Sequence, residues 1–461
     1  MAYPWRAVKP TTHPLAWVPP LQRLANLCFA AALAFLMATS AIAQDDTASE
    51  GLSGGSAQTG SGSSDDSNRA NPAPPPANPR PPNVDAWGNL VLTGKPLTFV
   101  GGFSVIRDDN LFKLATPSSD TIQTMSLGLR VNKSYSLQTF QFNFNKTFTR
   151  YSNFSYLNNS GMDYRGAWLW SLTPRITGTL SRDYRQSLVP FQETNGSTSR
   201  NMRVSENTNF NLDAWVTGGW HLTGGLNRSE QRTSQSVTVS PDTFTLSREL
   251  GGRYLTLSGN SISFVQRNTS GGYINSAGTI TSLTANGFRR EESELRISWR
   301  ATAKSSFSGR LTWLQHRQLG ASQYDVAGPA VDITYLWAVT GALQVSISAR
   351  DSITPTPDVV YTKITNKGLT IAPTWQFSPK TTIQASLSTT RNEYGGSSGT
   401  APLTGPARID TVDSASLGVN WAALPTLTLG ASLQRQQRRS NTAPLTDFND
   451  TTANFNASVA F

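Results

Sequence analysis

Apolar and polar residues alternate along the last segment of the chain. The apolar positions share one face of an extended strand: Phe455, Ala457, Val459 and Phe461. Asparagine and serine fill most positions between them. A period of two residues predicts a strand with one apolar and one polar face.

The same alternation recurs earlier as a repeated hairpin. In each repeat, an apolar series runs up to a tryptophan just before a short connection. The clearest of these residues are Trp170, Trp299, Trp337, Trp375 and Trp421. The connections contain turn-forming pairs such as Ser378-Pro379 and Leu424-Pro425. The pattern predicts antiparallel strands joined by tight turns.

Eight such turns are expected, near positions 133, 174, 218, 259, 303, 341, 378 and 424. They join eight strand pairs, and a first strand (96–106) and a last one (448–461) bring the expected total to 18. Sixteen strands remain an alternative, because segments 243–257 and 260–267 alternate irregularly. The other connections are longer and rich in Ser, Asn, Gly and Thr.

These features predict an all-β fold, a transmembrane antiparallel β-barrel of the Gram-negative outer membrane. Strand edges cannot stay unpaired in lipid, so the sheet must close. Short turns then belong in the periplasm and long loops outside. A soluble β-sandwich is the competing fold, but it does not require so many hairpins of one length.

Aromatic residues have a place in such a barrel. Trp170, Trp299, Trp337, Trp375 and Trp421 are expected to form a girdle at the inner membrane interface. Phe455, Val459 and Phe461 are expected to form the terminal signal that the barrel-assembly machinery reads.

The N-terminal part has a different composition. Basic residues precede an apolar run at 24–43 that ends in Ala41-Ile42-Ala43, which indicates a cleaved signal peptide over 1–43. A retained membrane anchor is the alternative. Residues 44–95 are rich in Ser, Gly and Pro and are expected to be a disordered periplasmic linker. The barrel domain is then 96–461.

Charge lies on the polar face of the strands. From Pro96 onward there are 33 Lys and Arg residues against 23 Asp and Glu residues. By alternation, several of the charged residues point into the lumen: Asp163, Arg165, Asp213, Arg296, Arg300, Asp332 and Arg350. Arginines there would favour anions and hydroxyl-rich chains. The alternative is that these residues pair with one another across the wall and stiffen it.

Four basic residues do not follow this rule. Lys146, Arg182, Arg228 and Arg435 fall on the lipid-facing parity, near the outer end of their strands. We expect them to contact lipopolysaccharide head groups, since a charge at the membrane midplane is costly. A β-bulge that turns them inward is the competing explanation.

Catalytic and metal-binding patterns are lacking in the sequence. Cys28, the only cysteine, lies in the signal peptide, and only His221 and His316 lie in the barrel segment. No serine stands in a recognisable nucleophile context, and no ligand cluster has metal-site spacing. We therefore expect no enzymatic activity, no cofactor, no metal and no nucleic acid partner.

A family resemblance suggests a role. Residues 108–114 (DDNLFKL), 119–142 and 164–186 resemble EpsL-type outer-membrane proteins of exopolysaccharide gene clusters. The resemblance implies an outer-membrane channel for exopolysaccharide biosynthesis and export. It also implies partnership with a periplasmic polysaccharide-export protein and an inner-membrane co-polymerase.

On this hypothesis the polymer would pass along Arg165, Arg296, Arg300 and Arg350, with Asp163 and Asp332 beside them. The alternative function is a passive uptake porin for small or anionic solutes. That alternative predicts a constricting loop folded inward, yet no loop clearly exceeds about 17 residues.

Overall fold

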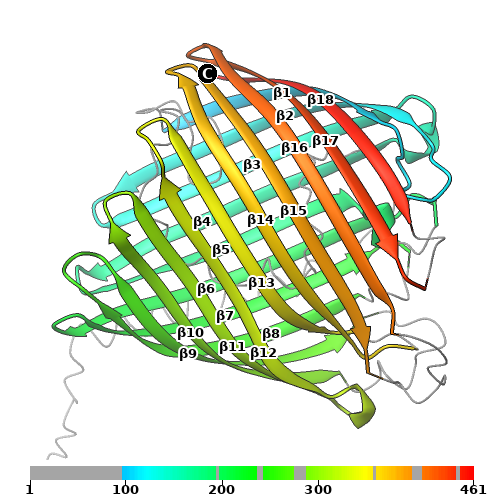
Figure 1. Cartoon of the computed structure of the whole chain (residues 1–461). Coiled ribbons are helices and arrows are strands. Elements are labelled where there is room, and N and C mark those ends of the chain that lie inside the picture. The colour runs from blue at the N-terminus through cyan, green and yellow to red at the C-terminus, as the bar shows by residue number, and fades with distance from the viewer. Residues whose placement is uncertain are drawn as a thin grey trace, which may run out of the picture. The chain divides into compact units, whose positions relative to one another are not determined.

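The computed structural model describes residues 96–193, 197–235, 242–274, 287–356, 360–396, 407–442 and 447–461. The expected signal peptide and linker lie outside these residues. Eighteen antiparallel strands account for nearly all of the described chain, and each strand pairs with its neighbours in sequence (Figure 1). The alternation seen in the sequence produces this arrangement, because each strand places apolar residues on one face only.

The first nine strands are β1 (Leu97–Asp108), β2 (Asp120–Tyr135), β3 (Gln138–Tyr151), β4 (Asn159–Thr173), β5 (Ile176–Leu188), β6 (Met202–Thr217), β7 (Trp220–Thr233), β8 (Thr243–Leu255) and β9 (Ser261–Tyr273). The other nine are β10 (Phe288–Thr302), β11 (Ser305–Gln318), β12 (Val326–Ala338), β13 (Leu343–Pro355), β14 (Lys363–Ser378), β15 (Thr381–Gly395), β16 (Ile409–Leu424), β17 (Leu427–Ser440) and β18 (Phe448–Ala460). Among the described loop residues there are three short 3-10 helices: η2 (Ser155–Leu157), η3 (Phe191–Glu193) and η4 (Ser322–Tyr324).

The sheet closes between its first and last strands. Val100 to Asp108 of β1 pair with Ala460 to Thr452 of β18, so no edge is left. The backbones of Phe99 and Phe461 exchange hydrogen bonds of 2.8 and 3.0 Å, and their rings stack at 6.1 Å. This closing seam confirms a barrel of 18 strands and excludes 16. The uncertain segments form two regular strands, β8 and β9.

Short and long connections lie at opposite ends, as predicted. The eight tight turns fall within a few residues of their expected positions, and the C-terminus lies at their end (Figure 1). Several strands extend a few residues further toward the long loops than the sequence pattern indicated. Among the described residues, no helix is both long and apolar enough to cross a membrane.

The two faces of the wall differ in chemistry. Large apolar side chains such as Phe103, Leu127 and Leu433 are exposed on one face, and hydroxyl, amide and charged side chains alternate with them on the other. Apolar surface of this extent is stable against lipid, so this face is the outer one. The polar face lines the lumen.

Candidate functional site: the lumen and its outer mouth

One part of the lumen wall carries nearly all of its charge at mid-height. Arg165 of β4 pairs with Asp183 of β5 at 2.9 Å, and Asp163 lies opposite Arg185 in the strand register. Nearer the tight turns, the carboxylate of Asp213 lies 2.6 Å from Arg253 and 2.6 Å from His221. Each acid therefore faces a base on the next strand.

The densest cluster lies on β8, β9 and β10. Arg267 contacts Glu249 at 2.6 Å and Glu292 at 3.0 Å, and Arg296 bridges Glu249 and Glu294. The side chain of Glu294 is only 1% exposed, so this acid is enclosed by its neighbours. Buried charges of this kind are retained only when paired, which explains the alternation of acids and bases here.

A third group continues the series on β11, β12 and β13. Asp332 accepts from Arg310 at 3.0 Å and from Arg350 at 3.1 Å. Arg310 is mostly buried, whereas the Arg350 side chain is 41% exposed. Arg350 therefore presents an accessible cation to the lumen while sharing its acid with another arginine.

The other part of the wall is polar but uncharged. On β14 to β18 and on β1 to β3, most inward positions at mid-height hold hydroxyl or amide side chains. They include Thr370, Ser386, Ser388, Ser414, Ser416, Ser432, Asn456 and Asn143. Arg130 is the one charged side chain at this height on the described parts of these strands. The lumen thus has a charged wall (β4 to β13) and a neutral wall (β14 to β18 and β1 to β3).

The outer mouth is lined by loops that fold inward. Leu111 and Phe112 of loop 109–119, Leu157 of loop 152–158 and Phe191 of loop 189–201 form a buried cluster, here called the apolar ledge. Phe112 contacts the rings of Phe154 and Phe191 edge-on, each at 4.8 Å between centroids.

Inward-facing residues of the wall support the ledge. It packs against Ile122 of β2 and Tyr151 of β3, which occupy lumen-facing positions at the outer ends of these strands. Asp120, fully buried, accepts from the backbone of Asn153 at 2.9 Å. Glu193 pairs with inward-facing Arg203 at 2.5 Å. The porin alternative calls for a loop that folds inward and constricts the lumen; these loops pack against lumen-facing residues, and a constriction by them stays a prediction.

The seven predicted lumen residues all occupy inward positions. Arg165, Arg296 and Arg350 are in ion pairs, as are Asp332 and Asp213. Arg300 lies close to a tight turn, and the described residues give its guanidinium no ion pair. A role for any of these residues in transport remains a prediction.

Sequence reasoning missed several charged lumen residues. Glu249, Arg267, Glu292 and Glu294 are absent from the predicted set, although they form the densest cluster. A signal existed in the run 291–296 (EESELR), where Glu292, Glu294 and Arg296 share one parity. The partners on β8 and β9 were hidden because their strands alternate irregularly.

The predicted girdle tryptophans lie on the outer face, close to the tight turns. Trp299, Trp337, Trp375 and Trp421 are each exposed there, and Trp170 stacks on Phe210 at 5.8 Å. Phe455 and Val459 lie at the seam, opposite Val105 and Gly101 of β1. Their use as a membrane girdle and as an assembly signal stays a prediction.

The basic residues on the lipid-facing parity do lie on the outer face. The register of β5 with β6, and of β6 with β7, is continuous around Arg182 and Arg228, so no bulge turns them inward. Arg182 pairs with Glu206 at 2.5 Å, and Arg228 contacts Glu230 at 3.6 Å. Both arginines therefore have a carboxylate partner on the outer face, and their contact with lipopolysaccharide head groups stays a prediction.

A closed 18-stranded wall with an apolar outer face and a polar lumen defines a porin-type barrel of the outer membrane. Proteins of this class are channels and not enzymes. Several solved outer-membrane proteins are similar to this chain. OpdK of Pseudomonas aeruginosa is 10% identical, with 79% of this chain and 99% of that chain covered and a TM-score of 0.48.

Two further solved structures are similar. OccK2 (OpdF) of Pseudomonas aeruginosa, solved in complex with glucuronate, is 8% identical, with coverages of 79% and 96% and a TM-score of 0.48. A BenF-like porin from Pseudomonas fluorescens Pf-5 is also 8% identical, with coverages of 80% and 100% and a TM-score of 0.46. At these identities the likeness concerns the fold alone. No family model and no curated protein matches the chain.

The expectation of an EpsL-type protein for exopolysaccharide export is wrong. The solved structures named above as similar to this chain include a BenF-like porin and none named for polysaccharide export, and no family model matches the chain. Most of the residues that suggested it lie in β2, β3, β4 and β5, whose alternation is common to barrels in general, and the stretch 108–114 lies at the end of β1 and in the loop after it. The expected partners, exopolysaccharide, a periplasmic export protein and an inner-membrane co-polymerase, are withdrawn with it.

Proposed function

We propose that this protein is a passive uptake porin for small, polar solutes that carry negative charge. The observation that carries the proposal is the division of the lumen into a charged and a neutral wall. Exposed guanidinium groups such as that of Arg350 offer a carboxylate a charge-assisted hydrogen bond. The hydroxyl and amide groups of the neutral wall offer hydrogen bonds to the uncharged part of the solute.

The ion pairs keep such binding weak. Every mid-height arginine with a carboxylate neighbour is already partly neutralised, so a passing anion gains little at each one. Conduction needs binding that is favourable but weak, because a solute must enter the lumen readily and also leave it. Weak binding at successive arginines therefore favours passage over retention.

The apolar ledge supports a small solute. Its side chains lie on the lumen side of β2 and β3 at the outer mouth, where they reduce the space available. The solutes named for two similar porins, vanillate and glucuronate, are small carboxylates. Carboxylates of this size are consistent with the lumen of this chain.

A liposome permeation assay tests the proposal with three sugars of nearly equal size. We expect glucuronate to enter faster than glucose, and glucose faster than cationic glucosamine. A large dextran serves as the control for vesicle leakage and should stay outside. Equal rates for all three sugars would contradict selection by the charged wall. Faster entry of glucosamine than of glucuronate would show that the lumen selects cations instead of anions.

A further inference from the structure

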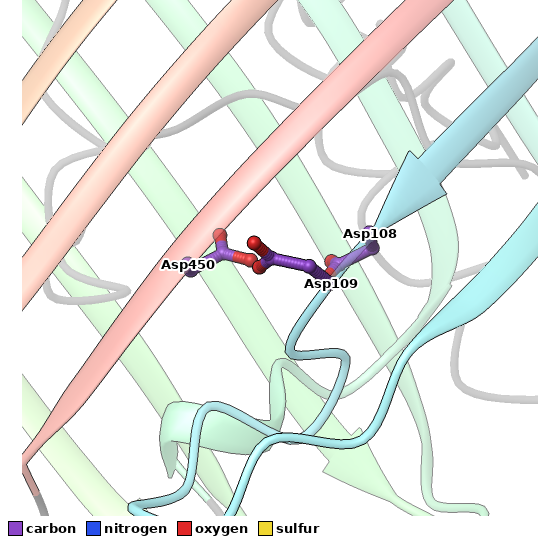
Figure 2. Close-up of side chains that lie close together, drawn as sticks. All are labelled: Asp108, Asp109 and Asp450. Carbon is purple, nitrogen blue, oxygen red and sulfur yellow. The ribbon is translucent and has the colours of Figure 1, made fainter.

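Three carboxylates meet at the outer end of the closing seam. Asp108 ends β1, Asp109 begins the following loop, and Asp450 is the third residue of β18 (Figure 2). One carboxylate oxygen from each lies within 4.8 Å of the other two. About 340 residues separate Asp109 from Asp450 in the chain, and only closure of the barrel brings them together.

The backbone holds these carboxylates in place. Asp108 Oδ1 accepts from the Asn110 amide at 2.8 Å, and Asp109 Oδ1 accepts from the Thr451 amide at 2.6 Å. The buried Asn110 side chain donates to the carbonyl of Asn449 at 2.9 Å. The cluster is therefore built into the seam by contacts from both strands.

The charges of the cluster do not balance. Lys113 Nζ lies 2.8 Å from Asp108 and 2.6 Å from Asp450, and it is the only basic group in ion-pair contact with the cluster among the described residues. Asp108 and Asp450 are only 7% and 3% exposed. Three carboxylates against one ammonium leave two negative charges without a partner, and two of the three carboxylates are buried, where unbalanced charge is costly.

An independent observation concerns Asp450 itself. Its Oδ1 atom is buried and has no hydrogen-bond partner in the described structure. Leaving a buried acceptor unsatisfied costs about 1–3 kcal/mol, and more when the group is charged. Such an oxygen within a group of carboxylates indicates a missing positive ligand.

We propose that Asp108, Asp109 and Asp450 bind one calcium ion at the outer end of the seam. Calcium prefers carboxylate oxygens and tolerates irregular geometry, with water completing its shell. A divalent ion would balance the two charges that Lys113 leaves, and the exposed Asp109 provides access from outside. Extracellular sites of this kind bind calcium with dissociation constants on the order of 10⁻⁴ to 10⁻³ M.

The position of the site gives it a structural role. It would join β1 to β18 where the barrel closes. It would also fix the start of loop 109–119, which contributes Leu111 and Phe112 to the apolar ledge. Calcium is therefore expected to stabilise the seam and the outer mouth together.

Calorimetric titration of the purified, detergent-solubilised full chain with calcium chloride tests the proposal, because this preparation lacks lipopolysaccharide. We expect one saturable site and a higher unfolding temperature with calcium than with EGTA. Asp109→Asn should weaken binding at least about tenfold, since one of three charged ligands is lost. The asparagine oxygen can still accept from Thr451 and one negative charge is removed, so stability in EGTA should not fall.

Asp413→Asn is the matched control. Asp413 is an exposed carboxylate on the outer face of β16, whereas Asp450 faces the lumen, and its loss should leave calcium binding unchanged. An absence of binding to the wild-type chain would overturn the proposal. So would equal binding by the Asp109→Asn variant, or stabilisation by acid alone with no response to calcium.

Discussion

Arg350 illustrates how a single residue can set the properties of the lumen. Its guanidinium shares Asp332 with Arg310, yet it remains the more exposed of the two arginines. Removal of Arg350 leaves the Arg310–Asp332 pair in place, so the wall keeps its structure. Its charge can therefore be tested separately from its contribution to folding.

Arg350→Gln should reduce the permeation of glucuronate about two- to five-fold and leave that of glucose nearly unchanged. This range corresponds to about 0.5–1 kcal/mol, the usual worth of a partly exposed ion pair. Arg439→Gln is the control, because Arg439 is exposed on the outer face of β17. An equal loss of glucuronate permeation in both variants would show that the net charge of the protein, and not the charge inside the lumen, sets the rate.

A glycine sets the packing of one girdle tryptophan. A methyl group added at Gly178 would lie 2.3 Å from the Trp170 ring and 2.1 Å from the Asn211 carbonyl oxygen. Gly178→Ala should therefore lower the free energy of unfolding by about 1–3 kcal/mol through overpacking. Gly252→Ala, also on the outer face, meets nothing within 4 Å and serves as the control in urea titrations. Equal stability of the two variants would contradict this account.

At the level of elements, the sequence allowed the strands and tight turns to be predicted, because alternation and turn chemistry are local. Even β8 and β9, whose sequences alternate irregularly, could be expected to be strands, because every strand edge of a barrel must be paired. The apolar ledge could not be predicted, since Leu111, Leu157 and Phe191 lie in three loops without periodicity. The same applies to the Asp109–Asp450 contact, which depends on closure and not on spacing.

The ledge should behave as a separable element. Phe112→Ala removes the ring that joins two neighbouring aromatic rings, and buried Phe→Ala changes typically cost about 3–5 kcal/mol. We expect the loops to loosen while the barrel stays folded, so single-channel conductance should rise and proteolysis of loop 109–119 should quicken. Phe377→Ala, at an exposed outer-face position, should change neither. Unchanged conductance in Phe112→Ala would show that the apolar ledge does not narrow the pore.

For the whole molecule, the seam is where the first and last strands must find each other. Phe461 contributes two backbone hydrogen bonds and a stacked ring to Phe99. Deletion of Phe461 should lower the heat-modifiable, membrane-inserted fraction and increase periplasmic degradation. Phe461→Ala keeps the backbone bonds and separates their contribution from that of the ring. Normal insertion of both variants would refute the predicted terminal signal.

The seam also has a consequence for the time course of folding. Seventeen of the eighteen strand pairings join neighbours in sequence and can form over short chain separations. Only the pairing of β1 with β18 encloses the whole barrel segment. Ring closure over that length costs about 2 kcal/mol more entropy than a hairpin does, by the logarithmic dependence on loop length. The pairing of β1 with β18 is therefore expected to form last, after the neighbouring strands have paired.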